Sequence, residues 1–90
     1  MAHYVAIIMP SGDGTLRVLF PDLTECETHG VTIDGARIAA TDALSQWLER
    51  NADHLPPPRD LASIKRDEEW LSKNEVDFSK AIVTMVSVIT

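Results

Sequence analysis

The sequence predicts an α+β domain with the element order β-β-β-α-(α)-β. An antiparallel β-hairpin, a short third strand and a closing strand form the sheet, a main helix packs on it, and a second helix is short. Three observations predict this fold. Residues 3–20 hold two β-rich segments around a turn, residues 33–50 repeat apolar residues at helical spacing, and residues 81–89 are apolar and largely β-branched. Ninety residues predict one domain, 1–90, with a thin core.

The hairpin comes first along the chain. Residues 3–9 are rich in strand-forming side chains, and residues 10–14 read Pro-Ser-Gly-Asp-Gly, a dense turn signal. Residues 15–20 then alternate, with Leu16, Val18 and Phe20 expected on one face. The pair Pro21-Asp22 breaks the ladder, and residues 26–30 can return as a short third strand that Gly30 ends.

The main helix is predicted over residues 33–50, with Thr32 as its N-cap. Prolines 56–58 make a stiff connector, and Asp60 is expected to cap a shorter helix that runs to about Ser72. One apolar stripe marks the face of the main helix that packs on the sheet: Ala36, Ala40, Ala43, Leu44, Trp47 and Leu48.

The closing strand, residues 81–89, is apolar on both faces. Ile82 and Val86 face one side, whereas Val83 and Met85 face the other. This pattern predicts either an interior strand or an edge strand that another molecule covers.

Charge narrows the function classes. Fourteen acidic and eight basic residues give a formal net charge of −6, which argues against direct nucleic-acid binding because phosphate contacts need clustered Lys and Arg. The same charge suits a basic protein partner, or it serves only solubility. Cys26 is the one cysteine, so no internal disulfide can form. The apolar stretches are too short for a signal peptide or a membrane span, and we expect a cytoplasmic protein.

Candidate catalytic and metal-binding patterns are weak. Cys26 and His29 are three residues apart, but a zinc site needs three or four ligands, so a buried thiol beside a polar histidine is the simpler interpretation. The sequence contains no nucleophile elbow and no phosphate-binding loop, so we expect no catalytic residue, metal or cofactor.

A cluster of carboxylates allows two sharper hypotheses. Asp13, Asp22, Glu25, Glu27 and Asp34 could hold Mg²⁺ for a nuclease, yet no Lys or Arg lies between Arg17 and Arg37 to bind a polynucleotide. The same carboxylates could instead form a docking surface for a basic protein, or be solvated loop residues.

The two tryptophans have different expected places. Trp47 belongs to the apolar stripe and is expected in the core. Trp70 lies in a charged stretch, so core and interface anchor both stay open.

A series of short motifs resembles the N-terminal domain of HicB antitoxins. Residues 4–58 carry most of the resemblance and residues 79–89 carry it more loosely. The matching motifs are Phe20-Pro21-Asp22-Leu23, Cys26, Thr28-His29-Gly30, Thr32, Ala36, Ala43-Leu44 and Trp47-Leu48. Two positions depart from the family pattern. Thr24-Glu25 replace a common Pro-Gly pair, and Gly35 stands where a Glu would complete the capping box with Thr32.

The resemblance implies a partial ribonuclease-H-like fold without ribonuclease activity. It also implies an antitoxin of a type II toxin–antitoxin system, which binds and masks a small basic HicA-type toxin that cleaves mRNA. The DNA-binding domain common at the C-terminus of this family is not expected in this chain. The residues expected to contact the toxin are Asp22, Leu23, Glu25, Glu27 and Asp34. Two alternatives stay open, a stand-alone oligomeric binding module and a metal-dependent nuclease; a homo-oligomer is also compatible with toxin binding.

Overall fold

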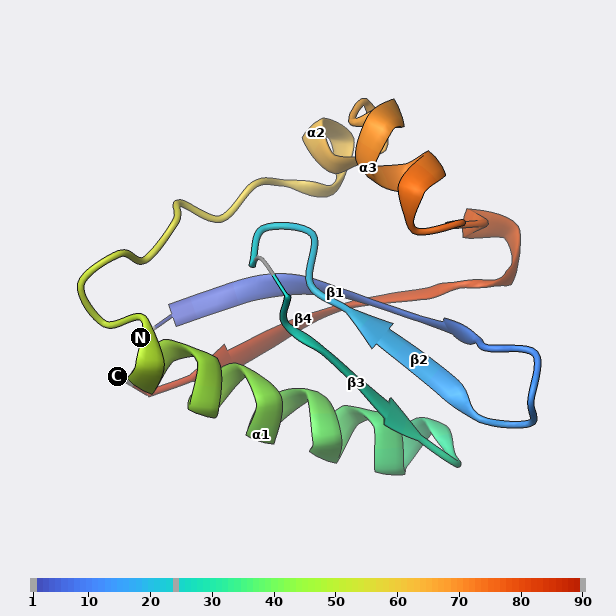
Figure 1. Cartoon of the computed structure of the whole chain (residues 1–90), viewed down its shortest axis with the longest axis horizontal. Coiled ribbons are helices and arrows are strands. Elements are labelled where there is room, and N and C mark those ends of the chain that lie inside the picture. Colours follow the sequence, from blue (N-terminus) through green and yellow to red (C-terminus); the bar gives the residue numbers. More distant parts are fainter. Residues whose placement is uncertain (1, 24, 90) are drawn as a thin grey trace.

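The structure, a computed structural model, describes residues 2–23 and 25–89. Four strands form one antiparallel sheet in the order β3-β2-β1-β4 (Figure 1). The strands are β1 (Ala2–Pro10), β2 (Leu16–Leu19), β3 (Glu27–Gly30) and β4 (Ile82–Val88). The helices are α1 (Ile33–Arg50), α2 (Leu61–Lys65), α3 (Glu68–Lys73) and the short 3-10 helix η1 (Phe78–Lys80). The predicted α+β class and the expected order of strands and main helix are therefore confirmed.

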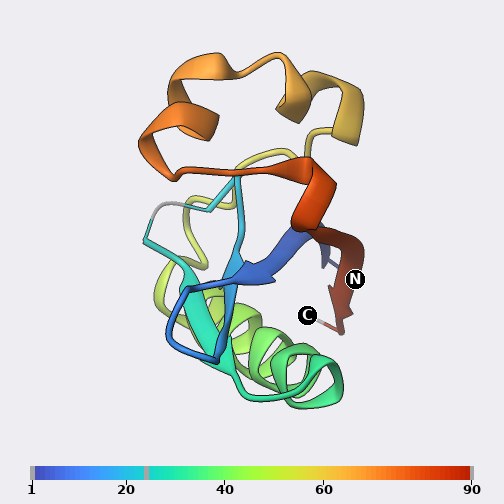
Figure 2. The ribbon, with the colours of Figure 1, turned by 90° about the vertical axis from the view of Figure 1, so that its right-hand side faces the viewer.

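Both faces of the sheet are covered. Helix α1 lies on one face, and the segment from α2 to η1 lies on the other (Figure 2). The core therefore has two layers, one built on Ile8, Val18 and Phe20 and the other on Ile7 and Leu19. Residues 4–9 of β1 are all buried because alternate side chains of this strand enter opposite layers.

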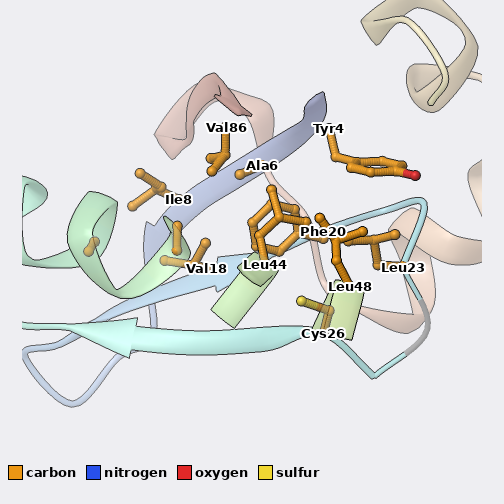
Figure 3. Close-up of a cluster of buried hydrophobic side chains, with 12 residues drawn as sticks. Tyr4, Ala6, Ile8, Val18, Phe20, Leu23, Cys26, Leu44, Leu48 and Val86 are labelled. Atoms are coloured by element: carbon orange, nitrogen blue, oxygen red, sulfur yellow. The ribbon is translucent and has the colours of Figure 1, made fainter. Parts of the chain in front are cut away.

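Helix α1 has the predicted bounds and packs with the predicted stripe. The Oγ1 of Thr32 accepts a hydrogen bond from the backbone N–H of Gly35 (3.0 Å), so the N-cap forms although the return half of the capping box is missing. Ala36, Ala40, Leu44 and Leu48 are buried, and Trp47 packs against them partly exposed. Figure 3 shows Leu44 and Leu48 among the sheet residues of this layer.

The second helical region differs from the prediction of one helix reaching Ser72. It is two short helices, because Asp60 caps α2 and Asp67 starts a new helix by accepting a hydrogen bond from the backbone N–H of Trp70. A run of charge at residues 65–69 hid this second start in the sequence. Ile64 is the fully buried anchor of the segment.

The closing strand is an edge strand. Among the described residues, strand β4 pairs only with β1, so of the two predicted alternatives the interior strand is wrong and the edge strand is the one observed. Its apolar character on both faces arises because the edge still contributes Val86 to the α1 layer and Val83 to the other layer.

Candidate partner-binding surface

The loop between β2 and β3 is a compact turn anchored in the core. The backbone N–H of Leu23 donates to the carbonyl of Phe20 (3.1 Å), and that of Cys26 donates to the carbonyl of Leu23 (3.3 Å). Phe20, Leu23 and Cys26 are buried and point into the α1 layer, as Figure 3 shows. These anchors leave Glu25 exposed at the surface with φ of 62°, a left-handed conformation that side-chain-bearing residues seldom adopt.

Arg59 ties this loop to α3. Its Nε and its backbone N–H both donate to the carboxylate of Asp22, at 2.5 Å and 2.8 Å, and its Nη1 donates to Asp67 (3.1 Å). Asp67 is the N-cap of α3, so one guanidinium joins the loop to the helix start. Hydrogen bonds to Asp22 and Asp67 raise the pKa of Arg59. The pKa of Asp67 is lowered first by the hydrogen bond from the backbone N–H of Trp70 and then by the one from Arg59.

The far end of α3 is also fixed to the sheet. Arg17 of β2 donates from Nη2 to the backbone carbonyl of Asn74, the C-cap residue of α3. Its Nε is buried without a partner among the described residues. Both ends of α3 are therefore held at a set distance from the β2–β3 loop.

A hollow of about 430 Å³ lies between that loop and α3, and we name it the α3 groove. Phe20, Pro21 and Leu23 give it an apolar floor, while Trp70 and Lys73 line the α3 side. Trp70 is partly exposed and also packs on the second core layer. The groove therefore offers apolar surface next to charged side chains, the combination found at protein interfaces.

A second hollow, the α1 groove, measures about 310 Å³ and lies on the other side of the same loop. Its lining includes Thr28, Asp42, Gln46 and Arg50. Glu25, Cys26 and Glu27 line both grooves, and we call these three residues the acidic ridge. Both glutamates of the ridge are exposed, so two carboxylates stand between two hollows.

Comparison with solved structures identifies the fold. The chain superimposes on the N-terminal domain of the antitoxin HicB from Burkholderia pseudomallei with a TM-score of 0.71 and 16% identity, covering 99% of this chain and 100% of that one. It also matches a chain of the HicA3 and HicB3 toxin–antitoxin complex (TM-score 0.69, 22% identity, 99% and 100% covered). The chain has the fold of the HicB N-terminal domain.

A third match is a chain of the toxin–antitoxin complex from Streptococcus pneumoniae, with a TM-score of 0.70 and 26% identity over 94% of this chain and 67% of that chain. No protein-family model and no curated protein matches the sequence. The resemblance inferred from short motifs thus agrees with the HicB-like fold.

The HicB-like fold separates the five residues expected to contact a partner. Glu25 and Glu27 lie together on the acidic ridge. Leu23 is 3% exposed, and the side chain of Asp22 is 4% exposed and bonded to Arg59, so neither offers a free surface group. Asp34 is exposed in the first turn of α1, about 24 Å along the helix from Arg50 beside the ridge. The departure at position 24 lies outside the described residues.

Three further residues of this surface were not predicted from the sequence. Arg59 and Lys73 looked like ordinary surface charges, and Asn74 carried no signal at all. Trp70 was left open between core and interface anchor; it packs on the second core layer and also lines the α3 groove, where a role as an interface anchor stays a prediction. The only sequence feature that bears on Arg59 is the run of prolines 56–58 before it, because this stiff connector restricts where Arg59 can lie.

The Cys26–His29 pair does not form a metal centre. The Cys26 thiol is buried in the α1 layer, 3.9 Å from the carbonyl of Ala43, whereas His29 is exposed on β3. Burial raises the pKa of Cys26 to about 11, which keeps the thiol protonated at neutral pH. Within residues 2–23 and 25–89, no group of three or more His, Cys, Asp or Glu side chains could hold a metal ion. None of the described helices is long and apolar enough to cross a membrane.

Proposed function

We propose that this chain is an antitoxin of the HicB type, which binds and masks a small basic toxin of the HicA type. The observation that supports this most directly is the match over nearly the whole chain to HicB structures, two of them in toxin–antitoxin complexes. The formal net charge of −6 supports it independently, because opposite charges accelerate the encounter of two proteins.

The acidic ridge is the contact surface in this proposal. Glu25 and Glu27 are exposed, and the apolar floor of the α3 groove lies beside them. A basic side chain of the toxin would pair with the ridge while an apolar or aromatic side chain enters the groove near Trp70. Asp22 and Leu23 act as positioning residues, because they hold the loop rather than face the solvent.

The antitoxin acts in this proposal by exclusion and not by catalysis. Occupying a basic RNA-binding surface with an acidic protein blocks the RNA, and this needs no reaction. We propose accordingly that the chain is not an enzyme, binds no nucleic acid itself and works in the cytoplasm. We also propose that it self-associates.

Charge reversal on the ridge tests the contact surface. A double variant, Glu25→Lys with Glu27→Lys, changes the charge by +4 at two exposed positions. We expect slower association with a basic HicA-type toxin, a shallower salt dependence and loss of growth rescue on co-expression. Stopped-flow association at several salt concentrations measures the first two effects.

The matched control reverses two exposed acids outside both grooves, Glu49→Lys with Asp53→Lys. This control changes the net charge by the same amount as the ridge variant. It should therefore slow association only through long-range electrostatics, without removing contacts at the ridge. Equal loss of binding in both double variants would show that the ridge is not the contact. Absence of any complex with HicA-type toxins would contradict the proposed function itself.

A further inference from the structure

The free edge of β4 is a second surface that the sheet leaves unpaired. Within the part of the chain that the structure describes, β4 has β1 as its one neighbouring strand, and Figure 2 shows β4 at the margin of the molecule. Its seven residues, Ile82–Val88, include no charge and no proline. Edge strands of monomeric proteins are usually blunted by charges, prolines or short length, since an open edge pairs with other chains. The opposite edge, β3, has only four residues, which include a glutamate and a histidine.

Large apolar side chains are exposed along this edge on both faces of the sheet. Ile82 is 37% exposed and Met85 is 56% exposed. Ile82 lies opposite Ile8 on the α1 face, whereas Met85 lies opposite Val5 on the other face. The backbone of every second residue of β4 also points its N–H and C=O away from β1, so hydrogen bonds and apolar contacts are both available.

We propose that a second copy of this chain pairs antiparallel with β4 across a twofold axis centred on Met85, joining two four-stranded sheets into one of eight strands. Antiparallel pairing about a twofold axis is self-complementary, because each strand gives and receives the same bonds. This register places Met85 against its own copy, Ile82 opposite Val88, and Thr84 opposite Val86. Because the axis is perpendicular to the sheet, the two α1 helices lie on the same face.

The two ends of β4 are complementary in shape in this register. A hollow of about 270 Å³ lies between the end of β4 and α1, lined by Leu48, Val88 and Ile89 together with Ser45 and Glu49. Ile82 of the second copy lies opposite Val88, at the mouth of this hollow and on the same face of the sheet. An exposed apolar side chain at one end of the strand thus meets a hollow whose wall includes the apolar residues Leu48, Val88 and Ile89 at the other end, twice per dimer.

The charge distribution favours a second copy over a basic partner at this edge. Two chains of net charge −6 repel each other, so a stable pair must meet where no carboxylates face one another. Ile82–Val88 meets that condition, whereas β3 and the acidic ridge do not. A basic toxin would find no counter-charge on β4 itself. This inference deepens the proposed self-association and does not depend on toxin binding.

Sedimentation over a concentration series tests the interface, with and without Met85→Lys. We expect wild-type chain to dimerise and to do so more tightly as salt rises, because salt screens the repulsion. Met85→Lys should give a folded monomer at the same concentrations, since position 85 is exposed in one copy. Ile38→Lys is the matched control, because Ile38 is an apolar residue on α1 that is at least as exposed as Met85, and this variant should dimerise like wild type.

Cysteine cross-linking tests the register and does not rely on weakening the pair. Met85→Cys places two thiols directly opposite across the axis, within the Cα separation of a disulfide, so oxidation should produce a covalent dimer. Ser87→Cys lies on the same face two residues away and should cross-link poorly. The buried Cys26 serves as an internal unreactive thiol.

Three results would overturn the inference: a wild-type chain that is strictly monomeric, a dimer unaffected by Met85→Lys, or cross-linking that Ser87→Cys gives as well as Met85→Cys. If Met85→Lys instead abolished toxin binding by a monomeric chain, the edge would belong to the toxin. Loss of toxin binding in the ridge variant alone bears only on the proposed function, so the two failures are distinguishable.

Discussion

The carboxylate of Asp22 accepts two hydrogen bonds from Arg59, a residue 37 positions further along the chain. One donor is the backbone N–H, which fixes the connector after the prolines, and the other is the side-chain Nε. Tyr4 supports the same connector by donating its hydroxyl hydrogen to the carbonyl of Pro56 (2.6 Å). The shape of the proposed binding surface therefore depends on a contact between its loop and a distant connector.

Removing the carboxylate should destabilise the fold. For Asp22→Ala we expect the free energy of unfolding to fall by about 2 kcal/mol, because two charge-assisted bonds are lost while the exposed part of Arg59 stays solvated. Urea unfolding followed by circular dichroism measures the change. Glu27→Ala, an exposed acid nearby, should shift it by no more than about 0.5 kcal/mol. An equal effect of both variants would contradict a structural role for Asp22.

Gly30 permits the close approach of β3 and α1. A Cβ at this position would lie 2.5 Å from the backbone N and 2.6 Å from the Cα of Ala36, neither of which can move without shifting the helix. We expect Gly30→Ala to lower the free energy of unfolding by about 3 kcal/mol. Gly35→Ala is the control, since its Cβ meets only the Thr32 hydroxyl, and it should change stability by less than about 1 kcal/mol. Similar unfolding midpoints would disprove the steric explanation.

Glu75 ends α3 in a left-handed conformation, with φ of 54°. The backbone N–H of Val76 donates to the carbonyl of Leu71 (2.9 Å) and that of Glu75 to the carbonyl of Ser72 (3.2 Å), which together define a Schellman motif. Glycine adopts this conformation without strain, so Glu75→Gly should raise the free energy of unfolding by about 0.5 kcal/mol, net of its greater unfolded entropy. Thermal unfolding measures it, and Lys73→Gly, inside the helix, should have the opposite sign. A destabilised Glu75→Gly would refute this prediction.

The thiol of Cys26 should be nearly inert in the folded protein. Burial raises its pKa to about 11, and the thiolate is the form that reacts with alkylating reagents. We expect negligible labelling by iodoacetamide at neutral pH, and rapid labelling once urea unfolds the chain. Mass spectrometry follows both reactions. Fast labelling under native conditions would mean that the β2–β3 loop opens readily.

Three helix-capping carboxylates should make the protein sensitive to acid. Backbone hydrogen bonds from Ser63 and Trp70 lower the pKa of Asp60 and of Asp67, and the Ser79 side chain does so for Asp77. Their stabilisation is therefore complete above an unfolded pKa of about 3.9 and is lost as pH falls through the lower folded values. Urea unfolding at a series of pH values from 7 down to 2 should show this decline as the pH falls below about 3.9.

Asp60→Asn isolates one of these caps. Asparagine also caps helices but does not titrate, so the variant should lose less stability in acid than wild type while remaining similar at neutral pH. Identical acid profiles would show that Asp60 does not contribute to the decline.

The sequence by itself determined the elements whose signals are local. Helix α1 was predicted with its bounds and its N-cap Thr32, because the apolar stripe repeats at helical spacing from Ala36 to Leu48. The hairpin and both faces of β2 followed from strict alternation around a glycine-rich turn. The motif series from Phe20 to Leu48 led to the HicB-like fold, because its residues lie in the anchored β2–β3 loop, at the N-cap Thr32 and in α1.

Only the tertiary structure decided what depends on contacts between distant residues. The pairing of Asp22 with Arg59 spans 37 positions, and it turned an expected surface carboxylate into a buried link. The edge position of β4 depends on which strand it pairs with, and apolar residues on both faces cannot distinguish an interior strand from an open edge. The α3 groove beside Glu25 and Glu27 exists because α3 lies against this loop, and no local pattern in the chain carries that information.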